Sequence, residues 1–140
     1  MGGYQANLKR EEYKMSLKTL FIITSIIAFL FGILFVIIPW FVYSLYGIES
    51  NPMLNYMGGL FGAALIVVGL ISWQSRNITD VIALKAITLS FFIANGIGFI
   101  IALVGQLNDV VNALGWLTVV IYLFLSIGFG YFRFSKSLAK

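Results

Sequence analysis

Three polar side chains inside apolar stretches are the residues with the clearest chemical potential. Asn95 lies within one long apolar stretch, and Thr118 and Tyr122 lie one helical turn apart in the next. At a rise of about 1.5 Å per residue, Asn95 and Thr118 would lie at similar depths in two neighbouring helices. Uncharged polar groups at membrane depth need a partner, so such residues are candidates for a functional site. The sequence therefore predicts an intramembrane polar pocket formed by Asn95, Thr118 and Tyr122.

The role of Asn95 has two interpretations. An amide facing lipid would be left unsatisfied, so we expect Asn95 to turn inward and to hydrogen-bond the following helix or a bound water. One interpretation is structural, an interhelical bond that contributes about 0.6–2 kcal/mol. The other is functional, a polar pocket that opens outward for a small ligand.

Most other site chemistry is absent from the sequence. The chain contains no cysteine and no histidine, which removes thiolate chemistry, His or Cys metal ligation and His-based acid–base catalysis. Glu49 and Asp109 lie in different loops, where carboxylates are usually solvated. We therefore expect no enzyme activity, no catalytic residue, no metal and no cofactor. The net charge is +4, but the basic residues are grouped along the chain in the way that sets the orientation of membrane proteins. No nucleic-acid partner is therefore expected.

Composition places the chain in a membrane. Of its 140 residues 61% are hydrophobic and 10% are charged, whereas soluble domains carry roughly 25% charged residues. Apolar runs of about 20 residues are long enough to cross the hydrocarbon layer. The predicted spans are about 17–38, 53–73, 79–103 and 110–132. The predicted fold is an all-α, up-down-up-down four-helix transmembrane bundle over 17–132, with an N-terminal segment 1–16, expected to be a frayed tail, and a tail 133–140.

The basic residues indicate the orientation. All nine Lys and Arg lie within residues 1–18, between residues 74 and 85, or after the last span. The two other loops carry only Glu49 and Asp109. Because cytoplasmic loops are enriched in Lys and Arg, both termini are predicted to be cytoplasmic and the protein to lie in the plasma (inner) membrane.

Pro39 interrupts the first apolar run. Proline removes a backbone donor and clashes with the preceding turn, so the helix should end or kink there. The aromatic segment after it, residues 40–46, either forms a short interfacial helix stopped by Gly47 or continues one long kinked span. Asn51 before Pro52 predicts the start of the second span. Asn77 with Asp80 resembles a capping box for the third.

Small residues at helical spacing predict the helix contacts. Gly58, Gly62 and Gly69 share one face of the second span, which we expect to be the surface on which the other spans pack. The most regular small-residue stripe runs along the third span and includes Ala94 and Gly98. The residues expected to pack helices are Gly32, Gly58, Gly62, Gly69, Ala94 and Gly98.

A low-specificity pattern covers roughly residues 20–76. It consists of Phe35-x-x-x-Pro39, Leu45-Tyr46-Gly47, the segment Gly59 to Ala64, Gly69 and Trp73-x-x-Arg76. It resembles small prokaryotic four-span membrane proteins of uncharacterised function. The resemblance implies a four-helix membrane fold and no particular chemistry.

These observations favour a non-enzymatic integral membrane protein. We expect an accessory or structural subunit of a membrane complex, or a homo-oligomer, because four small-residue faces exceed what one bundle must hide. The expected partners are membrane lipids and other membrane subunits or further copies of the chain. The alternative is a small transporter or channel for a neutral or lipid-like solute, using the Asn95 and Tyr122 region.

Overall fold

The protein consists of helices and the links between them in the part of the chain that the structure describes. The computed structural model describes residues 2–135, without the side chains of residues 13 and 15, and this part contains no strand. Its helices are α1 Gly2–Ile37, α2 Pro39–Leu45, α3 Pro52–Ser75, α4 Val81–Leu107 and α5 Gly115–Phe134. All but α2 are long and apolar enough to cross a membrane. The prediction of an all-α protein with four such helices is therefore confirmed, and residues 136–140 of the predicted tail lie outside the described residues.

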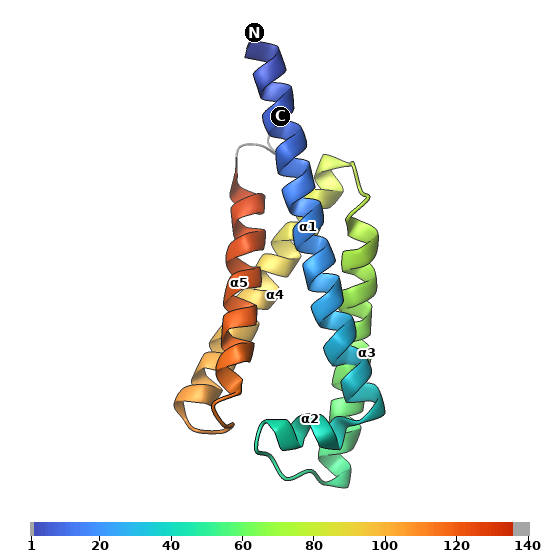
Figure 1. Cartoon of the computed structure of the whole chain (residues 1–140), viewed down its shortest axis with the longest axis vertical. Helices are drawn as coiled ribbons and strands as arrows, with labels where there is room; N and C mark the ends of the chain where they lie inside the picture. The colour runs from blue at the N-terminus through green and yellow to red at the C-terminus, as the bar shows by residue number, and fades with distance from the viewer. Residues whose placement is uncertain (1, 136–140) are drawn as a thin grey trace.

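The long helices form two pairs. Along the chain α1 and α4 descend while α3 and α5 ascend in Figure 1. α1 packs mainly on α3, α4 packs mainly on α5, and a smaller contact between α1 and α5 joins the pairs. The expectation that the second span is the surface for all the others is wrong, because the principal partner of α3 is α1.

Glycines explain the close approach of α1 and α3. A Cβ atom on Gly62 would lie 2.7 Å from the carbonyl oxygen of Gly32, so the two backbones touch directly. A Cβ atom on Gly69 would meet the Phe29 ring at 3.0 Å, and one on Gly58 would meet the Tyr43 hydroxyl at 2.8 Å. The face of α3 formed by Gly58, Gly62 and Gly69 is thus occupied by α1 and α2 and does not receive α4 or α5.

The two pairs meet at one end of the molecule, here called the basic end. It contains the N-terminal part of α1, the link between α3 and α4, and the C-terminal part of α5 (Figure 1). A buried apolar cluster joins these elements. Its centre is three rings, with Phe91 and Phe129 stacked at 4.8 Å and Phe21 5.4 Å from Phe129. The cluster holds the two pairs together at this end.

The opposite end, here called the α2 end, contains α2 and the link between α4 and α5 (Figure 1). α1 ends at Ile37, and Pro39 occupies the first position of α2, so the proline separates two helices. Gly47 then has a φ of 75°, a conformation that glycine adopts without a Cβ penalty. Of the two interpretations of this segment, the short separate helix is the one observed.

Several helix boundaries differ from those predicted. α1 begins at Gly2 because the segment before the first span is rich in good helix formers, and Lys14 pairs with Glu11 at 3.7 Å. The prediction of a frayed N-terminal tail is therefore wrong. Asn51 caps α3 as predicted, accepting a bond from the Leu54 amide at 2.9 Å.

The ends of α4 and the start of α5 were less well predicted. Asp80 itself caps α4 by accepting from the Ala83 amide at 2.7 Å, so the capping box with Asn77 is wrong. α4 continues to Leu107, and α5 starts only at Gly115. Residues 108–114 form a turn-rich link in which Asp109 has a φ of 52°. Local turn chemistry therefore displaces a boundary that hydropathy alone places at residue 110.

Candidate functional site

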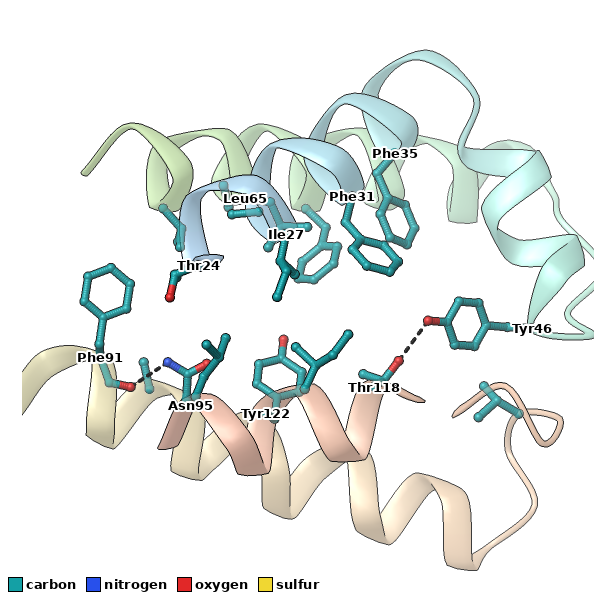
Figure 2. A pocket seen from close by; sticks show the side chains of 18 of the residues that line it. Thr24, Ile27, Phe31, Phe35, Tyr46, Leu65, Phe91, Asn95, Thr118 and Tyr122 are labelled. Carbon is teal, nitrogen blue, oxygen red and sulfur yellow. Dashed lines mark hydrogen bonds between the residues drawn. The ribbon is translucent and has the colours of Figure 1, made fainter. Parts of the chain in front are cut away.

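A cavity of about 460 Å³ lies between the two helix pairs. Its walls come from α1 and α3 on one side and from α4 and α5 on the other, as Figure 2 shows. The cavity exists because the pairs converge at the basic end and separate toward the α2 end (Figure 1). Its size falls in the range of about 300–1,000 Å³ that is typical of ligand sites.

The structure brings all three predicted pocket residues to this cavity. Asn95 on α4 and Thr118 and Tyr122 on α5 each line it. Figure 2 shows them along the same wall, with the Tyr122 hydroxyl directed into the space. The three residues were predicted from depth alone, and their common wall follows from the packing of α4 on α5.

The hydrogen bond of Asn95 differs from the one expected. Its side-chain nitrogen donates to the carbonyl oxygen of Phe91 at 2.7 Å, one turn back on the same helix. The bond to the following helix is therefore not made, and Asn95 is 7% exposed. Bonding back to the i−4 carbonyl satisfies one donor without a neighbouring helix. The side-chain oxygen of Asn95 keeps its capacity to accept a bond.

Tyr122 is positioned by a glycine on the facing helix. A Cβ atom on Gly98 would collide with the Tyr122 ring, so the ring lies directly against the backbone of α4. The predicted packing role of Gly98 thus has a specific partner. Ala94, four residues earlier, is exposed and borders the cavity. Ala94 contributes to the cavity wall, whereas a helix-packing role was expected for it.

Several residues of the cavity were missed by sequence reasoning. Thr24 on α1 faces the cavity opposite Asn95 in Figure 2, and its hydroxyl donates to the Leu20 carbonyl at 2.8 Å. Tyr43 and Tyr46 belong to the aromatic segment 40–46, for which no cavity role was expected, yet both line the cavity. The helical register of Thr24 with Ile27 and Phe31 was the available signal. The tyrosines gave none, because their positions depend on contacts with distant parts of the chain, Tyr43 with Leu54 and Tyr46 with Thr118.

Hydrogen bonds between the pairs cross the α2 end of the cavity. The hydroxyl groups of Tyr46 and Thr118 lie 2.8 Å apart and are joined in Figure 2. The side-chain nitrogen of Asn112 donates to the Leu45 carbonyl at 2.8 Å. The backbone nitrogen of Asn112 donates to the Tyr46 carbonyl at 3.0 Å. We call these three bonds the clasp. Together they link the segment after α2 to the start of α5.

The described lining of the cavity is uncharged. None of the residues that line it, within the described part of the chain, is charged. Most of the polar lining groups already have protein partners, including Tyr43, whose hydroxyl donates to the Leu54 carbonyl at 2.9 Å. Burial raises the pKa of Tyr43, which further favours the protonated hydroxyl that donates this bond. The arrangement can hold an uncharged molecule and offers no acid–base pair.

The comparisons with known proteins add no functional assignment. No protein-family model, no curated protein and no solved structure matches the chain. The function is therefore argued from the cavity and its residues.

Proposed function

We propose that the protein is a non-enzymatic, multi-pass membrane protein that binds a small neutral or lipid-like solute in the cavity between its helix pairs. The observation that carries this proposal is the uncharged cavity of about 460 Å³ that receives side chains from every helix. Large apolar side chains form most of its wall, and a few hydroxyl and amide groups supply direction. Ligand sites commonly combine these two features.

A matched pair of isoleucines tests the proposal. Ile27 lines the cavity, whereas Ile26 is 59% exposed and does not. Native mass spectrometry of the protein released from mild detergent should show a small bound molecule in the wild type and in Ile26→Trp. Ile27→Trp fills the cavity and should lose that bound mass. A protein that never carries a bound molecule, or an equal bound mass in both variants, would contradict a ligand-binding cavity.

An accessory or homo-oligomeric role is a second candidate, favoured by one face of α4. Ala86 and Ser90 are exposed on the small-residue stripe of α4, while Gly58, Gly62 and Gly69 of α3 are used inside the protein. Small residues allow close helix approach in lipid, so this face suits another membrane helix or a second copy. Native gels in several mild detergents should show a complex that Ser90→Trp disrupts. A monomer in every detergent would count against this role.

We also propose that both termini face the cytoplasm, with the protein in the plasma membrane. The described basic residues gather at the basic end, and Glu49 and Asp109 lie in links at the α2 end. The chain has no native cysteine, so Ser50→Cys gives a single label site. A membrane-impermeant maleimide should label Ser50→Cys in intact cells and should label Asn77→Cys only after permeabilisation. The reverse pattern would invert the orientation.

A further inference from the structure

Two polar groups in the cavity have no hydrogen-bond partner within residues 2–135. They are the hydroxyl of Tyr122 and the side-chain oxygen of Asn95. Asn95 is 93% buried, since only 7% of its surface is exposed. Neither atom is among the fully enclosed polar atoms that lack a partner, so both are open to the cavity, where the low-polarity surroundings strengthen any hydrogen bond that they make. The protein therefore retains a donor and an acceptor that a ligand can satisfy.

Both unsatisfied groups lie on the same wall of the cavity. Figure 2 shows Asn95 and Tyr122 on the side formed by α4 and α5, while Ile27, Phe31 and Leu65 project from the opposite side. One wall thus offers two unpartnered polar groups at its centre, whereas the other is mainly apolar and its Thr24 hydroxyl already donates to the Leu20 carbonyl. A ligand that matches both walls has an apolar body and one small uncharged polar group. A hydroxyl group suits the site because it can donate to the Asn95 oxygen and accept from the Tyr122 hydroxyl.

The route into the cavity further limits the ligand. The phenylalanine cluster closes the basic end, and the clasp crosses the α2 end. On α3, Phe61 and Ala64 line the cavity and are exposed, and Ala94 does the same on α4. α3 and α4 are not among the packed pairs of helices. The cavity therefore opens sideways, toward the region that lipid occupies when these helices span a membrane.

We propose that the cavity takes a neutral, hydroxyl-bearing, long-chain lipid-like molecule from the bilayer between α3 and α4, holding its hydroxyl between Asn95 and Tyr122. This inference rests on the proposed ligand-binding function and specifies its ligand class. A small water-soluble solute would leave the apolar wall unmatched. A charged lipid headgroup would lose its hydration without gaining a counter-charge.

Photolabelling of the full chain in nanodiscs tests the ligand class. The probe is hexadecanol with a diazirine in its chain, in discs of phosphatidylcholine, and adducts are mapped by mass spectrometry after proteolysis. Adducts should fall on cavity residues such as Leu65, and unlabelled hexadecanol should compete better than hexadecane. Tyr122→Phe retains the ring against Gly98 and should weaken the competition by hexadecanol roughly two- to tenfold, as expected for one lost hydrogen bond. Tyr56→Phe, at an exposed position outside the cavity, should change nothing.

Neighbouring alanines on α3 test the route. Ala64 lines the cavity, whereas Ala63 is exposed and does not. Ala64→Phe should slow the appearance of cavity adducts, and Ala63→Phe should leave their rate unchanged. Cavity adducts that form equally fast in both variants would overturn entry between α3 and α4.

The remaining outcomes separate this inference from the proposed function. Cavity adducts for which hexadecane competes as well as hexadecanol would overturn the hydroxyl-bearing class, while ligand binding would stand. No competable adduct in the cavity, with a bound molecule still lost in Ile27→Trp, would overturn the lipid-like class alone. Adducts confined to the outer helix faces, with no bound molecule in any variant, would overturn both.

Discussion

At the scale of single residues, Gly98 controls the position of the one cavity tyrosine whose hydroxyl is free. Gly98→Ala should destabilise the protein by about 1–3 kcal/mol, because the new methyl group collides with the Tyr122 ring. Replacing glycine in a helix with alanine would otherwise stabilise it by about 0.5–1 kcal/mol. A loss of stability in Gly98→Ala would therefore show that Gly98 is in close contact with the Tyr122 ring. Unfolding in detergent mixtures, followed by circular dichroism, measures it.

Gly105 is the matched control on the same helix. A Cβ atom there would have nothing within 4 Å, so Gly105→Ala should leave stability unchanged or slightly higher. Equal effects of the two substitutions would show that the Tyr122 ring moves away freely. In that case Gly98 would have no role in positioning the hydroxyl.

At the scale of helices, the α1–α3 contact depends on Gly62. Gly62→Ala should destabilise the protein by about 1–3 kcal/mol, because the new methyl group would lie 2.7 Å from the Gly32 oxygen and 2.9 Å from the Val36 nitrogen. Both are backbone atoms, so only a shift of the whole helix relieves the clash. Gly59→Ala, three residues away with nothing within 4 Å, should be tolerated. Detergent unfolding of both variants gives the comparison, and an equal loss would contradict the contact.

Helices were the part of this fold most open to prediction from sequence. Hydropathy reports the length of an apolar run directly, and Asn51 before Pro52 is a local signal that the α3 cap obeys. The pairing of α1 with α3 was not predictable in the same way, because a small-residue face does not say which helix it will meet. The prediction of the start of α5 failed because residues 110–114, apolar except for Asn112, are held in a link by turns, including the left-handed Asp109.

The candidate site was partly predictable for a related reason. Asn95, Thr118 and Tyr122 are polar residues in apolar runs, and their depth follows from helical rise alone. Thr24 was a weaker signal, since threonine commonly bonds to its own helix, as it does here. The contribution of Tyr46 depends on its long-range contact with Thr118 on α5, which no local pattern indicates. The sequence could therefore predict a cavity residue whose position follows from its own helix. It could not predict a residue whose position depends on contacts between several helices.

At the scale of the whole molecule, the two helix pairs are held differently at their two ends. The basic end is joined by the buried cluster around Phe21, Phe91 and Phe129, where large side chains interlock. The α2 end is joined by the clasp, and interhelical hydrogen bonds in membrane proteins contribute only about 0.6 kcal/mol each on average. Separation of the pairs should therefore begin at the α2 end and leave the basic end intact.

Combining Thr118→Val with Asn112→Ala removes the side-chain bonds of the clasp and should widen the distance between the pairs at the α2 end only. The absence of native cysteines allows two spin-label pairs to be compared by electron–electron double resonance. Ser50→Cys with Val110→Cys spans the pairs at the α2 end, and Lys18→Cys with Phe134→Cys spans them at the basic end. The first distance distribution should broaden toward longer values, and the second should not change. A shift at both ends would mean that the clasp supports the whole interface, and a shift at neither would mean that the phenylalanine cluster alone fixes the angle between the pairs.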